Sequence, residues 1–162
     1  MFKSTDGGSS WTAINSGLPG GSVVQVRAAS SIAVDPKNPA ILYIGLSWIG
    51  LTGNDPYSRG LFKSIDGGAS WKQLSTGLPE ESNFDFGPIA IDPRDRGTVY
   101  VGTDAGILRS TDGGETWSVV NFGLPAISSL ALDPQDPNRM YVGTYGGLFV
   151  TTFPAGRSTI RR

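Results

Sequence analysis

Short apolar runs, each bounded by turn-forming residues, recur along the whole chain. In the clearest group of runs, the first is apolar and ends at an Asp-Pro pair. This run predicts an innermost strand that is apolar on both faces. A β-branched and aromatic run, an alternating run and a Trp-led run follow it. These runs cover residues 88–92, 98–103, 107–110 and 117–120. We therefore expect a unit of four short antiparallel strands.

The unit is repeated. Residues from Phe2, Leu61 and Ile107 can be superimposed, and so can those that start at Ile32, Ile89 and Leu130. The Asp-Pro pairs at Asp35, Asp92 and Asp133 are 57 and 41 residues apart. The shorter spacing is that of a four-stranded propeller blade, for which about 40–45 residues are typical.

A second motif, S-x-D-G-G-x-[ST]-W, occurs at 4–11, 64–71 and 110–117. It resembles the Asp-box, or BNR repeat, of β-propellers such as sialidases, xyloglucan-degrading endoglucanases, sortilin-type receptors and the photosystem II assembly and stability factor. The resemblance implies an all-β fold with about three four-stranded antiparallel blades. We expect a propeller segment over 1–153, with blade parts 1–21, 22–80, 81–125 and 126–153, and a tail over 154–162.

The box residues are expected to be structural. Each Asp can accept hydrogen bonds from its own turn, the two glycines supply positive φ, and each Trp can wedge between neighbouring sheets. Metal ligation or acid catalysis by the Asp residues is the alternative, but the calcium-loop pattern of EF-hands is absent and no metal is expected. The residues concerned are Asp6, Trp11, Asp66, Trp71, Asp112 and Trp117.

The composition of the chain excludes several kinds of functional site. The chain has no Cys and no His, which excludes thiol nucleophiles, disulfides and imidazole bases or ligands, and we expect no cofactor. The 13 basic and 14 acidic residues leave a net charge of −1, which disfavours a nucleic-acid partner. No apolar stretch approaches the ~18 residues of a membrane span, so a soluble chain is expected. Its compartment stays open, with secretion or the cell envelope if a parent chain carries a signal.

Functional residues are expected on one end of the blades, where the loops depart from the repeat. Residues 46–60 form an insertion between a second and a third strand, and the connections into two first strands are long. Their aromatic and polar side chains suit a carbohydrate or peptide surface, although the aromatic residues could simply cover the base of the loop. The candidates are Trp48, Asp55, Tyr57, Arg59, Arg27, Asn83, Asp85 and Asp104.

Two functions remain open. The first is a non-catalytic binding or scaffold module for a protein or carbohydrate partner. The alternative is a fragment of a xyloglucanase- or sialidase-like glycoside hydrolase, for which Asp85, between two Phe residues at the mouth of an inner strand, is the catalytic candidate. The resemblance would then imply an arginine trio with a tyrosine nucleophile, or a catalytic pair shared by two propellers, and no such set is evident.

The repeats do not make a full ring. The chain starts inside a third strand, contains two whole units and ends with three strands of another, where Phe153 replaces the box Asp. Closed propellers have about 4–8 blades. We therefore expect a partial propeller belonging to a longer chain, or half of a six-bladed ring formed by a homodimer.

Overall fold

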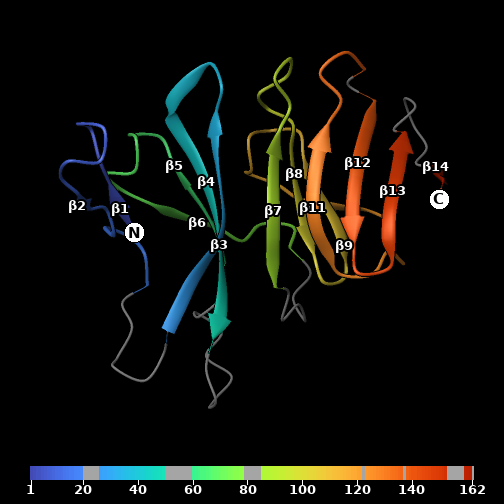
Figure 1. The fold of residues 1–162 in the computed structure, drawn as a ribbon, viewed down its shortest axis with the longest axis horizontal. Helices are drawn as coiled ribbons and strands as arrows, with labels where there is room; N and C mark the ends of the chain where they lie inside the picture. Colours follow the sequence, from blue (N-terminus) through green and yellow to red (C-terminus); the bar gives the residue numbers. More distant parts are fainter. Residues whose placement is uncertain are drawn as a thin grey trace.

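The computed structural model describes residues 1–19, 26–49, 60–78, 85–121, 123–136, 138–152 and 159–161; at 26–28, 47–49, 121, 152 and 159–161 it describes the backbone only. These residues form four antiparallel sheets (Figure 1). Sheet N contains β1 (Phe2–Lys3) and β2 (Thr12–Ala13). Sheet A contains β3 (Val26–Asp35), β4 (Asn38–Ile49), β5 (Gly60–Ser64) and β6 (Lys72–Leu74).

Sheets B and C complete the described fold. Sheet B contains β7 (Phe86–Ile91), β8 (Val99–Thr103), β9 (Gly106–Ser110) and β10 (Ser118–Asn121). Sheet C contains β11 (Ile127–Leu132), β12 (Arg139–Thr144), β13 (Gly147–Thr152) and β14 (Thr159–Arg161). Strands that follow one another in sequence pair within each sheet, as in the blade of a propeller. The residues that the structure describes contain no helix long and apolar enough to cross a membrane.

Turn chemistry explains why these strands end where they do. In the third box, Gly113 and Gly114 have φ of 72° and 94°, a conformation that costs a residue with a Cβ atom free energy. The chain therefore reverses between β9 and β10 at this Asp-Gly-Gly sequence, and it does the same in the two earlier boxes. The Asp-Pro turns reverse it between the first and second strands of sheets B and C.

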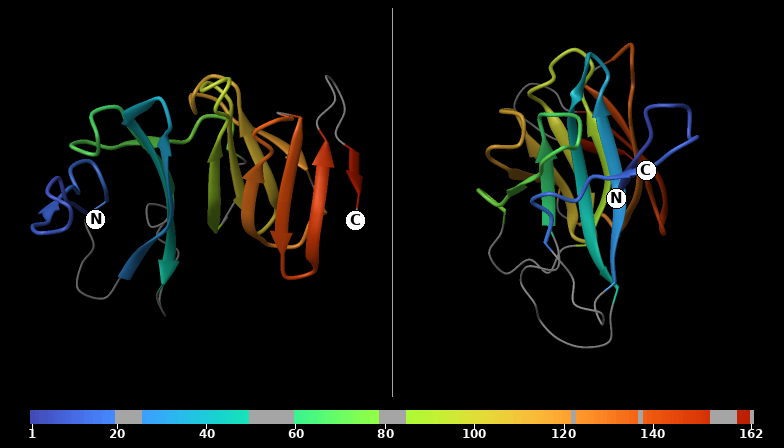
Figure 2. Two further views of the ribbon diagram at one scale, coloured as in Figure 1. Left: turned by 45° about the horizontal axis from the view of Figure 1, so that its top comes forward. Right: turned by 90° about the vertical axis from the view of Figure 1, so that its left-hand side faces the viewer.

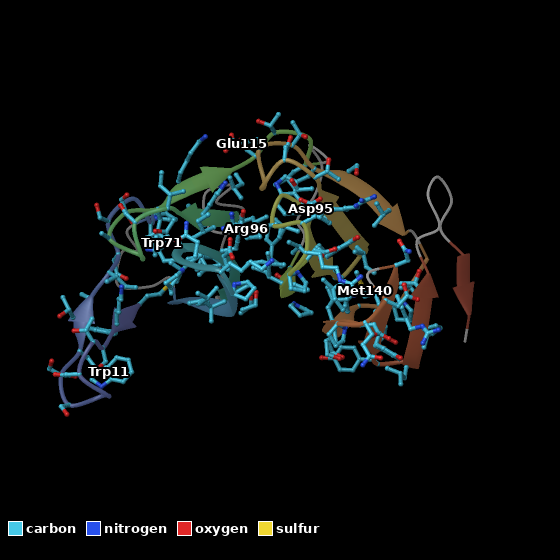
Figure 3. All side chains as sticks on the ribbon, turned by 90° about the horizontal axis from the view of Figure 1, so that it is seen from above. Trp11, Trp71, Asp95, Arg96, Glu115 and Met140 are labelled. Atoms are coloured by element: carbon cyan, nitrogen blue, oxygen red, sulfur yellow. The ribbon has the colours of Figure 1, made fainter. Side chains whose placement is uncertain are left out.

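The sheets follow one another along an arc, as seen from above in Figure 3. The first strands β3, β7 and β11 contact one another in turn, and the box turns lie at the outer side of the sheets. The box turns and the Asp-Pro turns lie at one end of the strands, at the top of Figure 1. We call the opposite end, which carries the turn at 104–105 and the turn at 145–146, the loop end.

The core consists of apolar layers between successive sheets. We call the face of a sheet that meets the next sheet in sequence its forward face, and the opposite face its rear face. Between sheets A and B, Tyr43 and Leu61 of the forward face pack with Val101 and Trp117 of the rear face. Equivalent layers lie between sheets B and C and between sheets N and A.

The structure confirms the all-β, partial-propeller prediction and differs from it in two places. First, β14 pairs with β13 inside the segment expected to be a tail, because the Thr-Ile pair at 159–160 suits a strand edge. Second, inner strands are less buried than expected. Ile32 and Val34 of β3 are 54% and 48% exposed, because sheet N contributes only two outer strands to cover the rear face of sheet A.

Candidate functional site

The box carboxylates are engaged within their own turns. Asp66 Oδ1 accepts hydrogen bonds from the Ser70 backbone N–H at 2.9 Å and the Ser64 hydroxyl at 2.8 Å. The hydroxyl and N–H of Ser70, followed by the hydroxyl of Ser64, lower the pKa of Asp66 to about 2. Asp6 has the same arrangement and a pKa of about 2, and equivalent bonds lower the pKa of Asp112. These carboxylates therefore stay ionised and orient their turns.

The box tryptophans lie between sheets where a preceding sheet is present. Trp71 and Trp117 are each 5% exposed. The Trp71 indole Nε1–H donates to the carbonyl of Ile14, which directly follows β2, at 3.0 Å, and that of Trp117 donates to the carbonyl of Gly114 in its own box at 3.1 Å. Trp11 belongs to the first box, donates to Gly8 and remains 63% exposed.

The Asp-Pro turns join neighbouring sheets at the same end. Asp35 Oδ1 accepts the backbone N–H of Lys37 at 2.8 Å, and its other oxygen lies 3.5 Å from Arg96 Nη1 of the next sheet. Arg94 Nη2 donates to the carbonyl of Pro134 at 2.8 Å, which links sheet B to sheet C. The polar groups of this end are thus used mainly to hold turns and sheets together.

The loop end brings two predicted residues together. Asp85 precedes β7, Asp104 follows β8, and both are exposed. The Asp85 backbone N–H donates to Asp104 Oδ1 at 3.3 Å. The Asp104 turn is held by Thr103, whose hydroxyl donates to the Gly106 carbonyl at 2.9 Å. The Asp104 carboxylate therefore lies beside the backbone of Asp85, and Asp85 is exposed at the start of β7.

Sequence reasoning missed Tyr145, the most exposed large apolar residue at the described loop end. Its side chain is 90% exposed, in the turn between β12 and β13. Thr144 holds this turn as Thr103 holds the other, with its hydroxyl 3.1 Å from the Gly147 carbonyl. Aligning T-D-A-G at 103–106 with T-Y-G-G at 144–147 would have found it, because Tyr145 takes the place of Asp104.

The other predicted residues are placed only in part. Arg27 and Trp48 are register partners on β3 and β4, so their backbones face each other near the loop end of sheet A; their side chains are not described. The rest of the set lies outside the described residues: Asp55, Tyr57, Arg59 and Asn83. The described part of the site therefore consists of Asp85, Asp104 and Tyr145.

The described part of the chain contains no metal-ligand cluster, and a groove lies away from the loop end. No group of three or more Asp or Glu side chains there could hold a metal ion. A groove of about 200 Å³ lies between sheet N and the second box, with Lys3, Ser10 and Asp66 among its lining residues. It is at the end of the strands opposite to the loop end, so it does not extend the site formed by Asp85, Asp104 and Tyr145.

Comparison with known proteins agrees with this architecture. The model of the BNR/Asp-box repeat matches residues 108–119. No curated protein matches the sequence significantly. Among solved structures, an ancestral GH74 enzyme has a TM-score of 0.66 at 23% identity, over 92% of this chain and 19% of that protein. The GH74 xyloglucanase from Xanthomonas campestris has a TM-score of 0.65 at 18% identity, over 93% of this chain and 24% of that protein.

A third solved structure with a different name is also similar. YCF48 from Cyanidioschyzon merolae has a TM-score of 0.60 at 20% identity, over 88% of this chain and 38% of that protein. The chain thus spans between about a fifth and two fifths of the length of these three proteins. At such identities the similarity establishes the propeller fold alone, and a fold does not determine a function.

Proposed function

We propose that this chain, which carries Asp-box repeats on the fold of a β-propeller segment, is a non-catalytic binding module that holds a protein or carbohydrate partner at its loop end. The observation that carries the proposal is Tyr145, a fully projecting aromatic ring on a turn where the preceding repeat has an aspartate. An aromatic ring costs little conformational entropy when it binds, and it offers stacking area with one polar tip.

Asp85 and Asp104 add polar recognition to the same end. Both residues are exposed, and the turn that carries Asp104 is held by hydrogen bonds, so their carboxylates can accept hydrogen bonds from hydroxyl, amide or cationic groups of a partner. By contrast, the box carboxylates already bond to their own turns. The two exposed aspartates of the loop end can therefore contact a partner, whereas the box carboxylates of the opposite end orient their own turns.

The test is a parallel screen of peptides and of soluble oligosaccharides against the immobilised chain. We expect one class to bind, and Tyr145→Ala to raise the Kd about tenfold or more, as removal of an aromatic anchor does. Asp104→Asn should weaken binding less, because it keeps one acceptor oxygen. Ile65→Ala is the matched control, since Ile65 is 71% exposed in a box turn at the far end. Equal binding by Tyr145→Ala and the control would refute a site at the loop end.

The paired carboxylates support glycoside hydrolysis as a second candidate. Glycosidases need two carboxyl groups on either side of the scissile bond, about 5–10 Å apart depending on mechanism. Asp85 and Asp104 are two carboxylates on neighbouring strand ends. Release of reducing sugar from xyloglucan, abolished in both Asp85→Asn and Asp104→Asn, would establish this activity; turnover that survives both changes would exclude this pair.

A further inference from the structure

A hydrogen bond from a lysine of one sheet to a glycine carbonyl in the box of the next sheet occurs twice within the chain. The hydroxyl of Tyr43, on the forward face of sheet A, donates to the Gly113 carbonyl in the box of sheet B at 2.8 Å. Lys63 Nζ donates to the same carbonyl at 2.7 Å. One sheet earlier, Lys3 Nζ donates to the equivalent carbonyl of Gly67 at 2.8 Å. The forward face of a sheet thus holds the box of the sheet that follows.

Apolar packing accompanies these hydrogen bonds. Leu74, from the last strand of sheet A, packs with Trp117 in the core layer between sheets A and B. Ile14, which follows β2, packs in the same way with Trp71 between sheets N and A. Each internal box is therefore covered by the forward face before it.

Sheet C has a forward face of the same kind, and it is uncovered. Its second-strand tyrosine, Tyr141, is 36% exposed, whereas the equivalent Tyr43 and Tyr100 are 1% and 2% exposed. Its third-strand Leu148 is 65% exposed, whereas the equivalent Leu61 is 0% exposed. In sheet A the equivalent positions are covered by sheet B and its box, whereas no described sheet or box lies against these positions of sheet C.

Sheet N has the complementary surface, and it too is uncovered. Trp11 is 63% exposed where Trp71 is 5% exposed, and Phe2 is 66% exposed where the equivalent Phe62 is 1% exposed. The carbonyl equivalent to those of Gly67 and Gly113 belongs to Gly7. The two uncovered surfaces lie at opposite ends of the arc (Figure 2), so they do not meet each other in this structure.

We propose that these two surfaces bind each other between molecules, so that the forward face of sheet C in one copy receives the first box of a second copy. In this contact the Tyr141 hydroxyl donates to the Gly7 carbonyl of the second copy, and Leu148 packs against its Trp11 and Phe2. The occupant is a second copy because the chain itself carries both halves of an interface that it builds twice internally. The contact is heterologous, and repeating it gives a closed ring or an open array.

This contact is weaker than its internal counterparts. Val150 stands where Lys63 stands in sheet A, so the ammonium donor to the box carbonyl is lost. The internal contacts also benefit from the covalent connection between sheets, which raises their effective concentration. Association should therefore depend on protein concentration.

The test is the solution mass of the chain, measured by light scattering over a hundredfold range of concentration. The wild type should associate, and Leu148→Arg and Trp11→Glu should each stay monomeric with an unchanged circular dichroism spectrum. Mixing the two variants should restore a 1:1 complex, because each retains the surface that the other lacks. A mixture that stays monomeric would overturn the proposal, as would a wild type that is monomeric throughout.

Two further variants separate this contact from general stickiness. Tyr141→Phe removes one neutral hydrogen bond and should weaken association about three- to tenfold. Ile65→Glu changes an equally exposed apolar residue that lies on neither surface and should leave association unchanged. If Leu148→Arg blocks association and Trp11→Glu does not, sheet C pairs with itself and the head-to-tail contact is wrong.

Discussion

At the scale of single residues, the same position of the box motif contributes differently to the free energy of unfolding in different copies. Trp71 is enclosed between sheets N and A and donates a hydrogen bond across that layer, whereas Trp11 projects from the first box. Truncating a buried aromatic side chain removes its transfer free energy and leaves a cavity. Truncating an exposed one removes little, because its ring was already in contact with water.

We therefore predict unequal costs for the same substitution. Trp71→Ala should lower the free energy of unfolding by about 3–5 kcal/mol, and Trp11→Ala by less than about 1 kcal/mol. Urea titrations at a concentration where the chain is monomeric measure both. Equal losses would show that the first box is buried in solution.

The box carboxylates predict how stability depends on pH. Their folded-state pKa is about 2 for Asp6 and Asp66, below the ordinary value of 3.8, so the unfolded chain binds more protons in this range. Stability should therefore be fully present above about pH 4 and should be lost as the pH falls towards 2. Thermal melting between pH 2 and 6 measures this, and Asp66→Asn should flatten the acid branch. An unchanged acid branch in this variant would contradict the role of Asp66.

At the scale of elements, the Gly-Leu-Pro sequence that follows β2, β6 and β10 determines how closely a neighbouring box strand can approach. A Cβ atom at Gly77 would lie 2.6 Å from the backbone oxygen of Trp117, and one at Gly17 would lie 2.1 Å from that of Trp71. Gly123 has the same sequence context, but a Cβ atom there meets nothing within 4 Å. The three glycines have positive φ, so they differ in contact and not in backbone conformation.

This difference makes Gly123→Ala a matched control for Gly77→Ala. Both variants incur the backbone strain of a Cβ atom at positive φ, about 1 kcal/mol. Gly77→Ala should cost at least about 1–2 kcal/mol more, because it must push the box strand of sheet B away from sheet A. Chemical denaturation measures both, and similar losses would mean that the two sheets can separate without cost.

At the scale of the whole molecule, stability should vary along the arc. Sheet B is covered on both faces, and all five residues of β8 are buried. Sheet C is covered on its rear face only, and β12 alternates between buried and more exposed residues. In a repeat array, each sheet is stabilised by its contacts with its neighbours, so the middle sheet should open least often.

Amide hydrogen exchange tests this gradient. In dilute protein, amides of β8 should exchange at least about tenfold more slowly than those of β12, and β1 and β2 should exchange fastest. At concentrations where the chain associates, protection of sheet N and of the forward face of sheet C should rise together. Uniform exchange across the sheets would indicate a single cooperative unit instead.

Local features of this protein were readable from sequence because their energy comes from residues close together in the chain. The Asp-Gly-Gly and Asp-Pro turns bond to their own backbones, so they locate the ends of strands such as β8 and β9 and establish a repeated four-stranded unit. Three copies of one motif then imply stacked sheets, because a single sheet cannot bury both of its apolar faces.

Only the tertiary structure decided which copies are buried and which are free. Trp11 and Trp71 occupy the same position of the box motif, but burial depends on the sheet that lies opposite, and only Trp71 has such a cover in the structure. The proximity of Asp85 to Asp104 likewise depends on strand register and not on spacing along the chain. The alignment of repeats places Tyr145 at the position of Asp104, but only the structure shows that its side chain is 90% exposed. The hydrogen bonds within a motif follow from its own sequence, because the bonded groups are close along the chain. The exposure of its side chains depends on which sheets lie beside it in the arc.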